Sequence, residues 1–135
     1  MITKDDMFAP LLAVYPSFQP AWQSFVAESE EHPEEEPLYY IALGLLAQHL
    51  VERLLAQDSS DFDAVFKIVE SWHCAGDAYV REAATIGLLE GLQNHAGHRS
   101  MDPDLFVPWL LPESKKWWDK LNTFWGGDAR ALRED

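Results

Sequence analysis

The side chains able to bind a metal lie mainly in the second half of the chain. His95 and His98 are three positions apart, and three more ligand types precede them: His73, Cys74 and Asp77. A structural zinc site takes four ligands in tetrahedral geometry. The chain has one cysteine, and adjacent residues such as His73 and Cys74 point away from each other on a helix. We therefore expect no metal site and no bound cofactor.

Nucleophilic catalysis is the second chemistry to consider, because Cys74 follows His73 directly. Neighbouring helical residues do not face each other, so this pair does not form a nucleophile and its base. The sequence also lacks a glycine-rich nucleophile turn and a phosphate-binding loop. Arg81 is one helical turn from Asp77, and we expect a structural ion pair there, or with a neighbouring helix, rather than a catalytic one with Glu82. The sequence predicts that the protein is not an enzyme.

A run of carboxylates between residues 28 and 36 is the most distinctive polar feature. Like charges repel one another, so this segment stays solvated on the surface. Carboxylates presented in this way can imitate phosphates and occupy the basic active site of another protein. We predict a partner-binding surface with a first set of residues in this run and a second set elsewhere: Glu31, Glu34, Glu35 and Glu36, then Asp61 and Trp72.

The whole chain shares this acidity. It has 23 acidic and 10 basic residues, giving a formal net charge of -13 over 135 residues. Such a surface repels phosphates and anionic lipids, so we expect no binding to nucleic acid or to a membrane. It favours a basic protein partner and speeds the encounter with one.

Cysteine usage and hydropathy predict where the protein resides. A single cysteine excludes an internal disulfide, and the opening MITKDDMF shows no signal peptide. The longest apolar run, Leu38–Ala47, is about half a membrane span. We expect a cytoplasmic protein.

Apolar spacing indicates helices along the chain. A first helix carries Met7 to Tyr15, and it is either bent at Pro10 or begins near Ala9 with Pro10 in its first turn. A second helix opens at Pro20. A strongly apolar third helix spans Leu38–Ala56, with Pro37 as its first residue. The fourth follows a capping-box pattern formed by Ser60 and Asp63.

The stretch from Trp72 to Asn94 predicts the centre of the fold. Asp77 is a good N-cap for a helix that is apolar over most of its circumference. Ala83, Gly87 and Gly91 are four apart and leave a groove in which the third helix can pack closely. Shorter helices follow from Pro103 and Pro112, the latter rich in tryptophan.

These elements predict an all-α fold of about six to seven helices in a compact antiparallel bundle of HEAT-like helical hairpins. Asp77, Val80, Arg81, Ala84 and Leu88 resemble the inner helix of a HEAT-type repeat. We expect one domain over residues 1–127, followed by a frayed tail over 128–135.

Three segments carry a further resemblance: YPSFQPAWQSF, EEPLYYIALGLLAQHLVERLL and GDAYVREAATIGLLEGLQN. Together they look like a family of small, acidic, all-helical bacterial proteins. Such proteins resemble immunity proteins of contact-dependent growth inhibition and related polymorphic toxin systems. The resemblance covers residues 15–94 and implies a protein that neutralises a cognate toxin inside the cell that makes it.

Three functions are therefore open at this point. The first is an immunity protein that covers the active site or substrate groove of a cognate toxin C-terminal domain, a basic nuclease. The second is a small HEAT-like interaction scaffold with a partner that is not a toxin. The third is an enzyme that uses His73, Glu82 or the pair His95 and His98, which requires a pocket joining at least three of them. The oligomeric state, and the choice between the acidic segment and the tryptophan-rich part as the interface, stay open.

Overall fold

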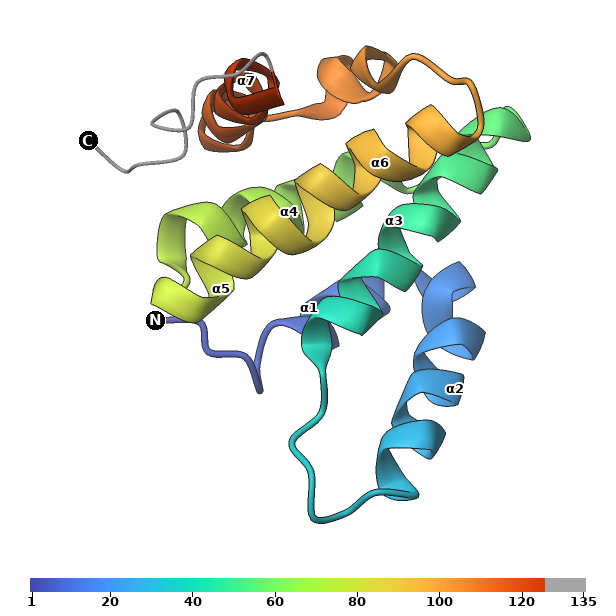
Figure 1. Cartoon of the computed structure of the whole chain (residues 1–135), viewed down its shortest axis with the longest axis vertical. Helices are drawn as coiled ribbons and strands as arrows, with labels where there is room; N and C mark the ends of the chain where they lie inside the picture. The colour runs from blue at the N-terminus through green and yellow to red at the C-terminus, as the bar shows by residue number, and fades with distance from the viewer. Residues whose placement is uncertain (126–135) are drawn as a thin grey trace.

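The protein is all-α over residues 1–125, which are the residues that the structure, a computed structural model, describes. Residues 1–125 contain seven α-helices and three helical segments of other types (Figure 1). In chain order they are α1 Phe8–Val14, η1 Pro16–Phe18, α2 Gln19–Glu30, α3 Tyr39–Leu55, α4 Phe62–Ala75, α5 Ala78–Glu82, η2 Ala83–Leu89, α6 Glu90–His98, η3 Pro103–Trp109 and α7 Pro112–Trp125. The predicted fold class and number of helices are confirmed. The predicted end of the domain at 127 and the tail at 128–135 lie outside the described residues.

Three of these segments, α5, η2 and α6, form one uninterrupted helical rod over residues 78–98. The rod begins as predicted at Asp77, whose Oδ1 accepts a hydrogen bond from the backbone N–H of Val80 at 2.9 Å. The middle of the rod, η2, is π-helical rather than α-helical. The sequence analysis missed this, since one wider turn hardly changes the spacing of apolar residues.

The close approach predicted for the two long apolar helices is confirmed. A Cβ atom on Gly87 would lie 2.7 Å from Leu43 Cδ1 of α3, and one on Gly91 would lie 3.1 Å from Ala47 Cβ. The missing side chains therefore let α3 cross the rod at short range (Figure 1). Two interior glycines cost about 1 kcal/mol each in helix propensity, and the tighter packing offsets that cost.

Helix α4 supplies the large side chains of the core, all of them buried: Phe62, Val65, Phe66, Val69 and Trp72. It contacts α1, the rod, η3 and α7. The predicted capping box at Ser60 and Asp63 is wrong. The N-cap is Asp61, which has a left-handed φ of 70° and makes no capping hydrogen bond. Instead, Asp58 Oδ1 accepts from the N–H of Ser60 at 3.0 Å and forms a turn before the helix.

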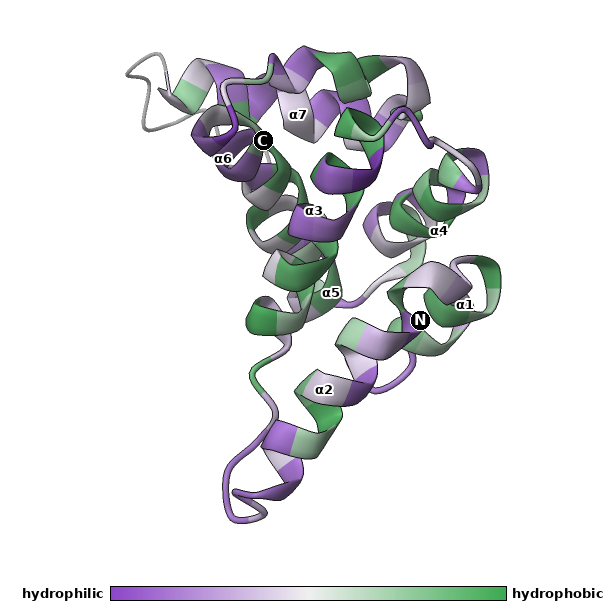
Figure 2. Ribbon diagram, turned by 90° about the vertical axis from the view of Figure 1, so that its right-hand side faces the viewer, coloured by the Kyte–Doolittle hydropathy of each residue, from purple (hydrophilic) through white to green (hydrophobic). Residues whose placement is uncertain are grey.

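The described residues contain no helix that is both long and apolar enough to cross a bilayer. The large apolar residues of the helices are mostly buried. The ribbon coloured by hydropathy shows a polar stretch at the turn between α2 and α3 (Figure 2). Helix α3 begins at Tyr39 rather than at the predicted Pro37, because Leu38 has an extended ψ of 81°.

Candidate functional site

The turn between α2 and α3 projects from one end of the molecule and carries the predicted carboxylates (Figures 1 and 2). We call residues 28–41 the acidic tip. Glu31, Glu34, Glu35 and Glu36 are all exposed there. Backbone hydrogen bonds between residues three positions apart shape the turn. The N–H of Glu31 donates to the carbonyl of Glu28, and the N–H of Glu35 donates to the carbonyl of His32. The first predicted set therefore lies together and faces solvent.

Apolar side chains lie within this acidic surface. Leu38 is 63% exposed and Ile41 is 54% exposed, which is unusual for residues of their kind. With Phe25 and Pro37 they line a hollow of about 190 Å³, and Glu28, Glu35 and Glu36 line the same hollow. Protein–protein interfaces combine apolar and charged side chains in this way.

One cation, Lys4, partly neutralises the negative charge of the tip. Lys4 Nζ lies 3.3 Å from Glu36 Oε2, and the carboxylate of Glu36 is still 85% exposed. The same contact raises the pKa of Lys4, through the hydrogen bond and the charge of Glu36. An exposed pair of this kind contributes little to stability, so the contact mainly orients the chain before α1 against the tip.

The second predicted set does not join the first. Asp61 is exposed, but it precedes α4 at the far end of α3, about 25 Å of helix away from the tip. Trp72 is 1% exposed, and its Nε1 donates to the carbonyl of Met7 at 3.1 Å. Trp72 is therefore not part of the exposed surface, because α4 turns the indole toward α1 and into the core.

The suspected metal ligands are scattered. Cys74 is exposed, while His73 is buried, and His95 Nε2 lies 3.2 Å from Glu52 Oε2 on another helix. Partial loss of solvation and the nearby carboxylates of Glu70 and Glu113 raise the pKa of the Cys74 thiol. The reactive thiolate is therefore disfavoured. A different trio in the described chain, His32, Glu34 and Glu35, brings its ligand atoms within 4.8 Å of one another on the exposed tip.

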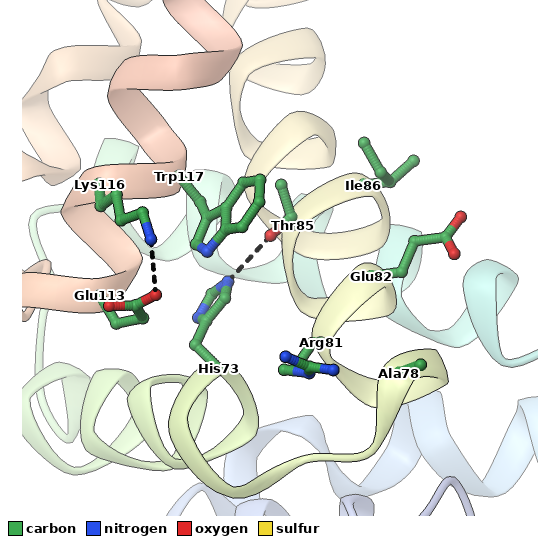
Figure 3. Close-up of a pocket in the computed structure, with 9 residues that line it drawn as sticks. All are labelled: His73, Ala78, Arg81, Glu82, Thr85, Ile86, Glu113, Lys116 and Trp117. Carbon is green, nitrogen blue, oxygen red and sulfur yellow. Dashed lines mark hydrogen bonds and ion pairs between the residues drawn. The ribbon is translucent and has the colours of Figure 1, made fainter. Parts of the chain in front are cut away.

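A larger pocket of about 580 Å³ lies between α4, the first half of the rod and α7 (Figure 3). His73, Thr85 and Trp117 line it, and Figure 3 shows Trp117 above His73 with Thr85 beside the indole. Arg81 and Glu82 line the side formed by the rod. The pocket thus contains two of the residues named in the enzyme hypothesis, His73 and Glu82, but neither His95 nor His98.

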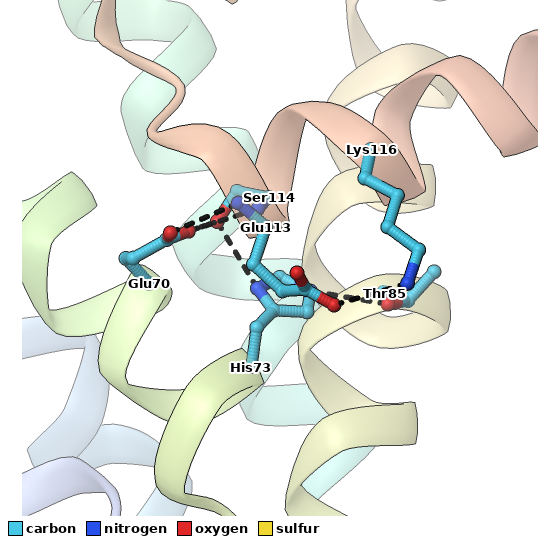
Figure 4. A network of polar contacts seen from close by, with 6 residues as sticks. All are labelled: Glu70, His73, Thr85, Glu113, Ser114 and Lys116. Atoms are coloured by element: carbon cyan, nitrogen blue, oxygen red, sulfur yellow. Dashed lines mark hydrogen bonds and ion pairs between the residues drawn. The ribbon is translucent and has the colours of Figure 1, made fainter. Parts of the chain in front are cut away.

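A buried chain of hydrogen bonds supports this pocket (Figure 4). Glu70 accepts from the backbone N–H groups of Glu113 and Ser114 at 2.9 and 2.8 Å, and from Ser114 Oγ at 2.8 Å. His73 Nδ1 lies 3.1 Å from both Ser114 Oγ and the carbonyl of Val69. Thr85 Oγ1 is 3.1 Å from His73 Nε2.

These contacts fix the tautomer of the imidazole. A carbonyl can only accept, and the Ser114 hydroxyl already donates to Glu70, so both contacts require a proton on His73 Nδ1. His73 Nε2 is then the acceptor for the Thr85 hydroxyl. Burial lowers the pKa of His73 and favours this neutral form. Burial also opposes ionisation of Glu70, yet the donated hydrogen bonds hold its pKa below the usual value.

Sequence reasoning missed the pocket because three of its parts come from distant segments. Glu70 and Ser114 are 44 residues apart, and Ser114 looks like an ordinary residue of a helical first turn. The one available signal was the pair Trp117 and Trp118, which point in different directions on a helix. Trp118 is buried, and Trp117 is half-buried beside the pocket.

Comparison with known proteins identifies the family to which the chain belongs. No curated protein and no solved structure matches the chain significantly. A family model described as "Domain of unknown function (DUF7674)" matches residues 8–126, which include every α-helix described above. The protein therefore belongs to the DUF7674 family.

Proposed function

We propose that this protein is an immunity protein that binds a cognate toxin domain, a basic nuclease, and covers its active site or substrate groove. The observation that carries the proposal is the acidic tip, where exposed Leu38 and Ile41 line a hollow together with carboxylates. A nuclease groove built to bind phosphates is cationic, and these carboxylates match it in charge.

The two kinds of side chain in the tip have separate tasks. Exposed carboxylates of the tip, such as Glu34 and Glu35, attract a basic partner from a distance and raise the association rate. The apolar side chains of Leu38 and Ile41 lose contact with water in the complex and slow its dissociation. The net charge of -13 strengthens the attraction over the whole molecule.

The first test is co-expression with the toxin domain encoded immediately upstream. We expect protection of the host cell and a stable complex whose association slows as salt is added, because salt screens the attraction. Failure to protect the cell, together with no detectable complex, would contradict the proposed function. Capture of a different basic protein through the tip would favour the HEAT-like scaffold instead.

The second test locates the interface. We expect E34K/E35K to lower the association rate constant at least about tenfold at low salt, which corresponds to about 1.4 kcal/mol. The matched control D63K/D119K makes the same change in net charge on α4 and α7, away from the tip, and we expect an effect below about threefold. Equal effects from both variants would show that only the overall charge matters, and would exclude the tip as the binding surface.

The third test addresses the apolar side chains of the tip. We expect L38S and I41S each to raise the dissociation rate constant about tenfold while leaving the association rate nearly unchanged. Both side chains are exposed, so the free protein should unfold at the same denaturant concentration as the unmodified protein. D61N, which suits the left-handed backbone at that position, should leave both rate constants unchanged if Asp61 lies outside the interface.

A further inference from the structure

We propose that a hollow between α2 and the turn after it receives an arginine side chain of the basic partner. We call it the Trp22 hollow. The inference rests on the proposed function, because the arginine belongs to that partner, and it adds the kind of side chain that the tip recognises. Its basis is the lining of the hollow, which combines aromatic rings with carboxylates and includes no Lys or Arg residue.

The Trp22 hollow is large enough for a long side chain. Its volume is about 400 Å³, inside the range of roughly 300 to 1,000 Å³ found for small-molecule sites. It shares Phe25, Glu35 and Pro37 with the hollow that Leu38 and Ile41 line. A partner that covers Leu38 and Ile41 therefore also lies beside the Trp22 hollow.

Three aromatic side chains line the hollow. Trp22 and Tyr39 are partly exposed, and the centre of the Phe25 ring lies 5.5 Å from that of Trp22 and 6.2 Å from that of Tyr39. Phe8 of the core packs against both Trp22 and Tyr39, at 4.6 and 5.5 Å between ring centres, and so limits their movement. The faces of such rings attract a cation, and indole attracts it most strongly.

The charged groups that line the hollow are all negative. They are Glu30 and Glu35, which are both exposed. Within residues 1–125 neither of these carboxylates has an ion pair. Lys4 contacts Glu36, which lines the adjoining hollow and not this one. A cation that enters the Trp22 hollow therefore meets two carboxylates that no cation of the described chain neutralises, whereas an anion is repelled.

Arginine fits this combination of rings and carboxylates better than lysine does. Its planar guanidinium stacks on aromatic faces and is less strongly hydrated than an ammonium group, so it loses less on leaving water. It also forms two parallel hydrogen bonds with one carboxylate. Its apolar stem can pack against Val26 and Pro33, which line the same hollow.

Three small probes test the hollow without the partner. They are N-acetyl-arginine amide, the lysine analogue and the citrulline analogue, in which an uncharged urea group replaces the guanidinium. NMR spectra of the full chain follow the indole N–H of Trp22, which is assigned by comparison with W22F. We expect the arginine probe to shift this signal with millimolar affinity, and the citrulline probe to bind at least about tenfold more weakly.

The same titrations contain the results that would overturn the proposal. One is the absence of any shift of the Trp22 signal at tens of millimolar arginine probe. Another is binding of the citrulline probe as tight as that of arginine, which would exclude a role for charge. Equally tight binding of the lysine probe would exclude the assignment to arginine.

Two double substitutions in the same segment locate the site. E30Q/E35Q neutralises the carboxylates that line the Trp22 hollow, and E31Q/E34Q makes the same change in net charge at residues that line neither hollow of the tip. All four side chains are exposed, so both variants should fold. We expect E30Q/E35Q to weaken binding of the arginine probe at least about fivefold and E31Q/E34Q less than about twofold. Equal weakening by the two variants would refute the site.

The complex with the toxin domain separates this inference from the proposed function. We expect E30Q/E35Q to raise the dissociation rate constant of the complex at least about fivefold more than E31Q/E34Q does. A stable complex that responds equally to both variants would contradict the role of the hollow and leave the immunity function intact. Specific binding of the arginine probe without any complex with the toxin domain would contradict the immunity function and support the hollow as an arginine site.

Discussion

At the scale of single residues, the imidazole of His73 joins three parts of the fold. It contacts Val69 of its own helix, Thr85 of η2 and Ser114 of α7, and each contact uses a specific ring nitrogen. Burial lowers its pKa, which means that the folded protein binds a proton there less readily than the unfolded chain does. The folded state therefore depends on a neutral ring at this position.

The sign of the pH effect follows from this difference. The unfolded chain takes up the proton near pH 6.5, whereas the folded protein resists it until lower pH, so stability falls as pH drops below 6.5. We expect H73Q to show a smaller loss of unfolding free energy between pH 7.5 and pH 5.5 than the unmodified protein, measured by urea titration. The pH dependence of H49Q is measured for comparison with that of H73Q, because burial and the charge of Arg53 also lower the pKa of His49. An identical pH dependence in H73Q and the unmodified protein would contradict this role.

Glu70 gives a second prediction at this scale. Its carboxylate accepts the free N–H groups at the start of α7, so a residue of α4 caps a helix 44 positions later in the chain. We expect E70A to lower the free energy of unfolding by about 1–2 kcal/mol, the usual cost of a lost cap. Hydrogen exchange should become faster along α7 first, while K67A on the same helix should leave that exchange unchanged. Equal exchange in E70A and K67A would show that Glu70 does not hold α7.

At the scale of elements, two glycines distinguish the effect of close helix packing on stability from the effect of helix propensity. A side chain on Gly87 meets Leu43 Cδ1 at 2.7 Å, whereas one on Gly44 of α3 meets nothing within 4 Å. Both positions lie inside helical segments. The two glycines therefore make a matched pair for testing how closely α3 and the rod approach.

We expect G87A to lower the free energy of unfolding by about 1–3 kcal/mol, because the methyl group forces α3 away from the rod. G44A should raise it by about 0.5–1 kcal/mol, because alanine favours the helix and finds open space. Urea unfolding monitored by circular dichroism measures both. Stabilisation of similar size in both variants would mean that the two helices are not in close contact.

The sequence predicted most of these elements but not their exact register or their cross-helix contacts. The i, i+4 spacing of Ala83, Gly87 and Gly91 correctly predicted a groove for another helix. The Ser60 pattern failed, because Asp58 forms a competing turn with the Ser60 N–H. Exposure of the carboxylates was predictable from self-repulsion, whereas the burial of Trp72 depends on the direction in which α4 turns its face.

The second pocket was harder to predict for a physical reason. Its residues come from α4, the rod and α7, and only the packing of those three elements brings them together. Nothing in the spacing of His73, Arg81 and Trp117 along the chain indicates that they share one cavity. Prediction from sequence worked for faces of a single helix and failed where several helices meet.

At the scale of the whole molecule, the apolar core and the excess negative charge lie in different places. The apolar side chains form one buried cluster, while the excess carboxylates lie at the surface and crowd most densely in the acidic tip. Self-repulsion among surface charges opposes the compact state, and salt screens it. The free protein and its proposed complex should therefore respond to salt in opposite ways.

We expect the melting temperature of the free protein to rise by a few degrees between about 20 mM and about 500 mM sodium chloride. Over the same range, association with the basic partner should become slower. E34Q/E35Q should reduce both effects, because it removes two of the crowded charges. A melting temperature that falls with added salt would show that attractive ion pairs, such as that of Glu52 with Arg99, outweigh the repulsion.

The short bridge between Ile2 and the turn at Gly76 affects the order of folding. Ile2 donates its N–H to the carbonyl of Ala75 at 2.8 Å, and its own carbonyl accepts from the N–H of Asp77 at 2.9 Å. During synthesis Ile2 can form these two hydrogen bonds only after some seventy-five further residues have left the ribosome. The junction between α4 and the rod therefore gains these contacts late, from a residue that was made well before it.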